Sequence, residues 1–189
     1  GIGGGAFLLH WDGRALQAWD GRETAPAEAD EKLFLQPDGK PMPFAKAVVG
    51  GRSVGTPGVL RMLHAAHRAQ GKLPWARLFE PAITLAERGF AVSPRLHQLL
   101  AGETALKDDP EARALYYRDD GTPRPVGETL RNPALAQVLR RIAAEGPIPF
   151  SAFMQMALYD SEYGYYLGQP FGRHGDFFTA SQLQPVFGA

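Results

Sequence analysis

Four prolines in this 189-residue chain directly follow a Ser, Thr, Asp or Asn and precede apolar residues at helical spacing. The pairs are Thr56-Pro57, Ser93-Pro94, Asp109-Pro110 and Asn132-Pro133. A polar N-cap followed by proline in the first turn is a typical helix start. Apolar residues recur at helical spacing after these pairs, so the pattern predicts a helix beginning at each of them.

The helical segments have recognisable ends and inner faces. Gly71 and Gly89 are placed to end the helices that precede them, because glycine tolerates the conformation that closes a helix. We predict helices over 57–70, 74–88, 94–100, 110–117 and 133–145, and a short one over 27–35. The last long helix is expected to turn Leu135, Val138, Leu139 and Ile142 inward.

Two apolar runs near the N-terminus flank Asp12-Gly13. This pattern predicts a β-hairpin with a two-residue type I′ turn. Phe7, Leu9 and Trp11 should share one face, with Leu8 and His10 on the other. A hairpin followed by many helices, without alternation of strands and helices, predicts a helix-rich α+β fold.

Composition excludes several classes of function. The 20 basic and 20 acidic residues balance, which argues against a surface built for nucleic acid. The chain has no cysteine, hence no disulfide and no thiolate metal site. His64 and His67 stand at i and i+3 without a third ligand and are interpreted as a solvated helix face, so no metal is expected. No apolar run is long enough to cross a membrane. With no initiator Met, we expect the natural N-terminus, and any signal peptide, to be missing.

Several short motifs occur in a specific order between residues 1 and 146. They are Gly1-Ile2-Gly3-Gly4-Gly5-Ala6-Phe7, Arg22-Glu23-Thr24-Ala25-Pro26, Val54-Gly55-Thr56-Pro57-Gly58, Leu73-Pro74-Trp75, Glu80-Pro81-Ala82, Ala86-Glu87-Arg88-Gly89-Phe90 and Leu130-Arg131-Asn132-Pro133-Ala134-Leu135. Together they resemble the large subunit of gamma-glutamyltransferases. The resemblance implies part of an N-terminal-nucleophile hydrolase fold, an αββα sandwich, and a parent activity of γ-glutamyl transfer or hydrolysis, as in glutathione breakdown.

One functional residue follows from this resemblance. Arg22 matches the arginine that binds the α-carboxylate of the glutamyl group, a role that suits the planar donor fork of a guanidinium. The alternative is a surface arginine paired with Glu23 or Asp20. The family's nucleophile is the N-terminal Thr of a small subunit, and no threonine here has that context. We therefore expect no catalytic residue, no cofactor for this part, and an inactive fragment that needs the missing small subunit.

A second set of motifs begins near residue 140. Gly146-Pro147-Ile148-Pro149-Phe150, Gly164-Tyr165-Tyr166 and Phe171-Gly172-Arg173-His174-Gly175-Asp176-Phe177-Phe178-Thr179-Ala180 resemble the opening of MidA-like SAM-dependent methyltransferases, a family that includes a protein arginine methyltransferase. The resemblance implies S-adenosylmethionine as the cofactor of that parent, its binding loop being absent here. Gly175, Asp176, Phe177 and Thr179 would then lie at the edge of a methyltransferase site, or form a turn packed by aromatics.

The two resemblances together predict a composite chain. Residues 1–146 would be the gamma-glutamyltransferase fragment and residues 147–189 the incomplete methyltransferase segment. Three functions stay open: γ-glutamyl transfer to small molecules, SAM-dependent methyl transfer, and a non-catalytic chimera. The expected location is periplasmic or extracellular for the first and cytoplasmic for the second.

Overall fold

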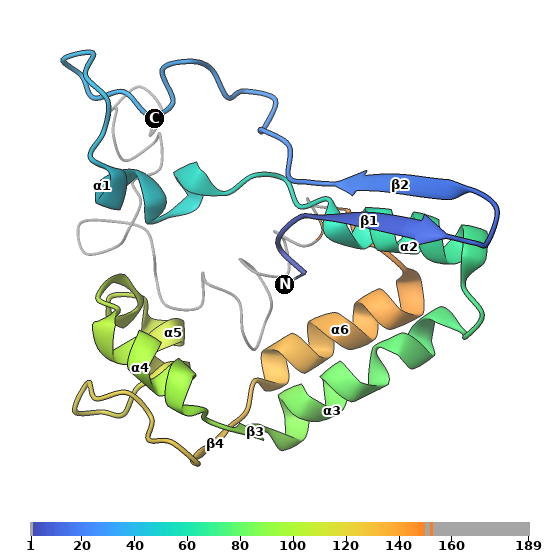
Figure 1. Ribbon diagram of the computed structural model, residues 1–189. Helices are drawn as coiled ribbons and strands as arrows, with labels where there is room; N and C mark the ends of the chain where they lie inside the picture. Colours follow the sequence, from blue (N-terminus) through green and yellow to red (C-terminus); the bar gives the residue numbers. More distant parts are fainter. Residues whose placement is uncertain (1, 150–151, 153–189) are drawn as a thin grey trace, which may run out of the picture. The chain divides into compact units, whose positions relative to one another are not determined.

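The computed structural model describes residues 2–149 and 152 (Figure 1). The chain divides into two units, Gly1–Pro147 and Ile148–Ala189, and almost all described residues belong to the first. This part mixes helices with two antiparallel two-stranded sheets, one of them formed by β1 and β2 and the other by β3 and β4. No helix among the described residues is long and apolar enough to cross a membrane.

The N-terminal hairpin is present, but its turn differs from the prediction. Strand β1 (Ala6–Trp11) pairs with β2 (Leu16–Gly21), and Trp11 lies opposite Leu16, so the loop has four residues rather than two. The Asp12 carboxylate accepts hydrogen bonds from the backbone N–H groups of Arg14 and Ala15 at 2.7 and 2.8 Å. These bonds close a wider loop than a type I′ turn. They also lower the pKa of the Asp12 carboxyl.

The two faces of the hairpin separate as the alternation predicts. Leu8 and His10 are half-buried on the face toward helix α2 (Val59–Gln70), which runs beside the hairpin in Figure 1. The side chains of Phe7, Leu9 and Trp11 share the other face, where they are 70%, 67% and 60% exposed. The apolar periodicity thus identified the two faces but not which one is covered.

Three predicted helix starts are confirmed. Helices α4 (Pro94–Gly102), α5 (Pro110–Tyr116) and α6 (Pro133–Glu145) begin directly after the predicted caps. Each cap side chain accepts a hydrogen bond from the backbone N–H three residues on: Ser93 from Leu96 at 3.1 Å, Asp109 from Ala112 at 2.7 Å, and Asn132 from Leu135 at 2.9 Å. Local chemistry decides these starts because the cap and its partner lie in one turn.

The predicted cap at Thr56 is wrong. Helix α2 begins at Val59 after Gly58, without a side-chain cap. The backbone of Thr56 instead pairs with Thr24, with N–O distances of 2.8 and 3.1 Å. A tertiary strand-like bridge therefore holds the residue that a local reading assigns to the helix. The end of α2 at Gly71 is as predicted.

Other segments are more broken than predicted. Residues 27–35 form turns instead of a helix, and the Asp30 carboxylate accepts a bond from the Lys32 N–H at 2.9 Å, which competes with helical bonding. The 74–88 stretch divides into the 3-10 helix η2 (Trp75–Leu78) and α3 (Glu80–Arg88), which Gly89 ends with a φ of 86°. The remaining elements are α1 (Phe44–Val48), η1 (Gly51–Ser53), β3 (Phe90–Ala91), η3 (Ala105–Lys107) and β4 (Thr129–Leu130).

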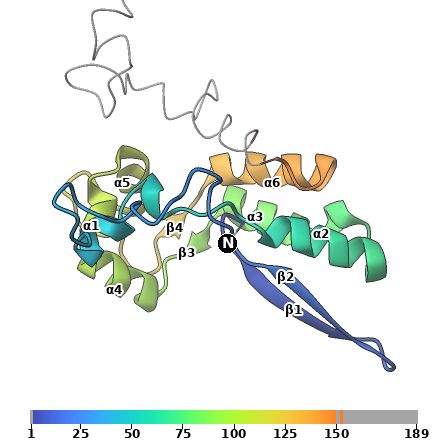
Figure 2. The ribbon, with the colours of Figure 1, turned by 90° about the horizontal axis from the view of Figure 1, so that it is seen from above.

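Helices α3 and α6 pack side by side (Figures 1 and 2), and α6 carries two residues with no exposed surface, Ala136 and Ile142. On α6, Ala136, Leu139 and Ile142 are buried, as predicted for the last two. Leu135 is 37% exposed, so the inner face is rotated from the predicted one toward Ala136. The indole N–H of Trp75 donates to the Ile142 carbonyl at 3.1 Å and ties η2 to the end of α6.

Candidate functional site

Three stretches that carry the resemblance motifs meet where β2 ends. The backbone of Thr24 bonds to Thr56, and the Val59 N–H donates to the Gly4 carbonyl at 3.2 Å. Three segments therefore converge here: the chain around Gly4, the segment after β2 and the entry to α2. Residues far apart in the sequence thus surround Arg22. The sequence alone did not predict that these segments meet.

An open cleft of about 550 Å³ lies at this meeting point. It is lined by residues of all three stretches: Gly3, Arg22, Glu23, Thr24, Ala25, Ser53, Val54 and Gly55. Ser53 donates its hydroxyl to the Val48 carbonyl at 2.6 Å. Arg22 provides the positive charge of the cleft and Glu23 the negative one, which suits a small polar ligand better than an apolar one.

The Arg22 side chain is 54% exposed, and its Nη2 lies 3.0 Å from Oε2 of Glu23. Its backbone N–H donates to the Asp20 carboxylate at 2.9 Å. This is the pairing that the surface-arginine interpretation expects. The described residues provide no second side-chain partner for the guanidinium, so donors remain for a ligand in the cleft.

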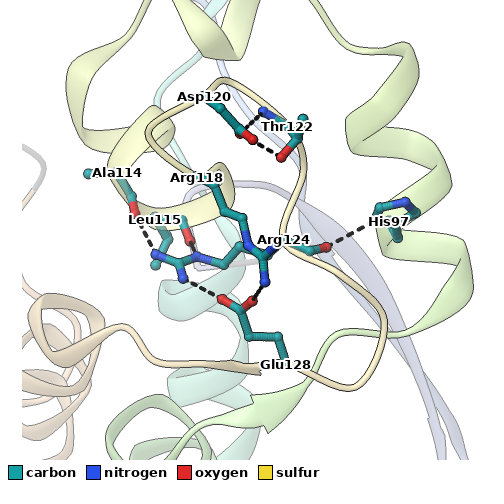
Figure 3. A network of polar contacts seen from close by, with 8 residues as sticks. All are labelled: His97, Ala114, Leu115, Arg118, Asp120, Thr122, Arg124 and Glu128. Atoms are coloured by element: carbon teal, nitrogen blue, oxygen red, sulfur yellow. Dashed lines mark hydrogen bonds and ion pairs between the residues drawn. The ribbon is translucent and has the colours of Figure 1, made fainter.

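A second polar cluster lies around Arg124 (Figure 3). The guanidinium donates to the carbonyls of Leu115 and Ala114 at the end of α5, at 2.7 and 2.9 Å. It also pairs with Glu128 at 2.6 Å, and Arg118 pairs with the other oxygen of that carboxylate at 2.9 Å. These bonds fasten the 117–128 loop to α5, so we interpret the cluster as structural.

The Glu128 carboxyl makes stability depend on pH. Hydrogen bonds from Arg124 and then Arg118 hold its pKa below the ordinary value of 4.5. A lowered folded pKa means that its stabilisation is complete above about pH 4.5 and is lost as acidification protonates the folded carboxylate. We expect the urea midpoint of the wild-type chain to fall below pH 4.5 more steeply than that of Glu128→Gln. The same dependence of the urea midpoint on pH in the wild type and in Glu128→Gln would contradict the prediction. The matched control is Glu145→Gln, which makes the same substitution elsewhere in the chain.

The histidine pair is not a solvated face. His64 and His67 are half-buried and pack on Trp75, with ring centroids 5.0 and 5.3 Å apart. The His67 ring nitrogen Nε2 is bonded to the Leu73 carbonyl at 2.8 Å. Both rings therefore belong to an aromatic contact between α2 and η2. Within residues 2–149 and at 152, no three or more metal-ligating side chains cluster.

The proposed methyltransferase edge cannot be placed. Gly175, Asp176, Phe177 and Thr179 lie outside the described residues. Their assignment therefore stays a prediction, and so does the division at residue 146 into parts of two different families.

Comparison with known proteins extends the first resemblance. The sequence profile of the family described as Gamma-glutamyltranspeptidase matches residues 1–181. Glutathione hydrolase 3 of Arabidopsis thaliana is 41% identical over 154 residues, which cover 79% of this chain and 23% of that protein. Glutathione hydrolase 2 of the same plant is 35% identical over 187 residues, 97% of this chain and 30% of the relative. The chain thus spans less than a third of the length of either.

A solved structure shows the same fold. The gamma-glutamyltranspeptidase from Pseudomonas nitroreducens complexed with L-DON superimposes with a TM-score of 0.71 at 33% identity, covering 82% of this chain and 46% of that one. Both the family profile and the 187-residue match continue beyond residue 146, so these comparisons give the methyltransferase resemblance no support. The chain belongs to the gamma-glutamyltranspeptidase family.

Proposed function

We propose that this chain supplies the glutamyl-carboxylate-binding part of an enzyme that transfers or hydrolyses γ-glutamyl groups. The observation that carries the proposal is the half-exposed guanidinium of Arg22 at the edge of the cleft, with Glu23 occupying one side of it. A planar fork with free donors suits a carboxylate, which can accept two parallel hydrogen bonds. Family membership and relatives named glutathione hydrolases support a γ-glutamyl compound as the ligand.

The bond-making step requires groups beyond these. Acyl transfer needs a nucleophile that attacks the γ-carbonyl and donors that stabilise the oxyanion. The hydroxyl of Thr122 is bonded to Asp120 at 2.6 Å, and no threonine in this sequence has the context of the family's nucleophile. We therefore propose that these 189 residues bind without turnover and that a small subunit supplies the nucleophile. The exposed face of Phe7, Leu9 and Trp11 offers apolar surface for such a partner.

Titration of the 189-residue chain tests the binding step. L-Glutamine keeps the α-carboxylate, whereas in L-isoglutamine that group is an amide. We expect millimolar binding of L-glutamine by amide chemical-shift changes, and weakening by about tenfold or more in Arg22→Ala, because a charge-assisted pair is lost. Arg22→Lys should recover only part of it, since an ammonium lacks the fork. L-Isoglutamine should bind no better to the wild type than L-glutamine binds to Arg22→Ala.

The controls separate this role from general charge effects. Arg61 lies exposed on α2 outside the cleft, so Arg61→Ala should bind L-glutamine as the wild type does. Equal affinity of the wild type and Arg22→Ala for L-glutamine would reject the assignment of Arg22. Release of p-nitroaniline from γ-glutamyl-p-nitroanilide by the purified chain would reject the proposed lack of turnover.

Methyl transfer is the second candidate, and the motifs between residues 140 and 189 are what favour it. Saturable binding of S-adenosylmethionine to the same preparation would favour this candidate, but we expect none, because the loop that binds it in that family is absent from residues 140–189. The cytoplasmic location depended on this candidate alone. The transpeptidase proposal carries the expectation of a periplasmic or extracellular protein.

A further inference from the structure

The stretches that wall the Arg22 cleft approach its backbone at glycines. A methyl group added at Gly58 would lie 2.5 Å from the Arg22 carbonyl oxygen and 2.7 Å from the Gly21 carbonyl oxygen. Both distances are far below van der Waals contact. Because the obstructing atoms are backbone atoms, no side-chain rotation can relieve them, and the chain at Arg22 would have to move.

Two more glycines, Gly5 and Gly55, lie close to the backbone of residues 22–24 from other directions. A methyl group at Gly5 would lie 2.7 Å from Cα of Arg22 and 2.8 Å from the Glu23 nitrogen. At Gly55 it would lie 2.9 Å from Cβ of Glu23 and 3.1 Å from the Thr24 carbonyl oxygen. Gly5, Gly55 and Gly58 therefore form a glycine cradle, which contacts residues 21–24 from the stretch before β1 and from the entry to α2.

Backbone conformation does not explain these glycines. None of the three has a φ in the left-handed region, so an alanine could adopt each backbone conformation. What an alanine lacks is room. Gly51 provides the contrast: its φ is also outside that region, and a methyl group there would meet nothing within 4 Å.

We infer that the glycine cradle positions Arg22 for its ligand. Close approach of three backbones fixes the peptide units on both sides of Arg22, and the Glu23 carboxylate, 3.0 Å from Nη2, then orients the guanidinium toward the cleft. This inference rests on the proposed function, because the ligand is the α-carboxylate of a γ-glutamyl compound. The three glycines act through Arg22 and Glu23 and need not touch the ligand themselves.

The test compares Gly55→Ala and Gly58→Ala with Gly51→Ala in the 189-residue chain. Binding of L-glutamine is measured by titration, hydrogen exchange at the backbone amides of Thr24 and Thr56 by NMR, and global stability by thermal unfolding. We expect Gly55→Ala, the mildest clash, to keep the wild-type melting temperature while L-glutamine binds about tenfold more weakly, because the arginine is displaced. Exchange at Thr24 and Thr56 should be about tenfold faster, since their mutual bonds open more often.

Gly58→Ala should show larger effects of the same kind, and Gly51→Ala none. If Gly58→Ala does not fold, the comparison of Gly55→Ala with Gly51→Ala still tests the inference. The inference would be overturned if Gly55→Ala kept both the wild-type affinity for L-glutamine and the wild-type exchange rates at Thr24 and Thr56. It would also be overturned if Gly51→Ala lost as much affinity for L-glutamine as Gly55→Ala. If the wild type itself does not bind L-glutamine, the proposed function fails, and the positioning role fails with it. The exchange rates then show separately whether the cradle fixes the segment.

Discussion

Replacing Ile142 with alanine should destabilise the chain by about 2–5 kcal/mol. Ile142 is fully buried on α6 where this helix packs against α3, and its carbonyl accepts the indole N–H of Trp75. Removing three carbons there leaves a cavity, because the two helices and η2 are held by several other contacts and cannot close fully around it. The change in free energy of unfolding is measured by urea titration at pH 7.

Leu135→Ala is the matched control on the same helix. Leu135 is 37% exposed, so its truncation removes less buried apolar surface and should cost about 1 kcal/mol. The slope of free energy against urea should be the same in both variants, since neither changes the surface exposed on unfolding by much. Equal destabilisation by the two substitutions would contradict the rotated inner face of α6.

Arg124→Ala should also be strongly destabilising, by about 2 kcal/mol. The substitution removes the donors to the Leu115 and Ala114 carbonyls and the 2.6 Å pair with Glu128. The two carbonyls belong to the last turn of α5, where helix carbonyls lack intrahelical partners. The last turn of α5 and the 117–128 loop should loosen together, and hydrogen exchange of their amides should report it.

Two further variants separate charge from geometry at this site. Arg124→Lys can still pair with Glu128 but cannot also reach two carbonyls with a planar fork, so most of the loss should remain. Arg118→Ala removes a side chain that is 53% exposed and makes one contact with Glu128, and should cost under about 1 kcal/mol. An Arg118 variant as unstable as the Arg124 variant would show that the shared carboxylate, rather than the α5 carbonyls, matters most.

Features that depend on a single turn of chain follow from local sequence. Ser93, Asp109 and Asn132 each bond to a backbone N–H three residues on, and these helices begin where predicted. Gly89 ends α3 for an equally local reason, since it adopts a φ of 86°; α2 also ends at Gly71, but in an extended conformation that other residues can adopt. The alternation in β1 likewise separated Phe7 and Leu9 from Leu8, since neighbouring strand residues point to opposite faces.

Which surfaces are covered, and which distant residues come into contact, depends on how the elements pack in three dimensions. Thr56 leaves the helix to pair with Thr24, His64 packs on Trp75 rather than facing solvent, and Ala136 takes the inner position expected of Leu135. Each of these outcomes depends on a partner distant in the sequence, whose position no local pattern encodes. The cleft at Arg22 is such a case, because Gly55 and Gly58 reach it only through the packing of α2 against the hairpin.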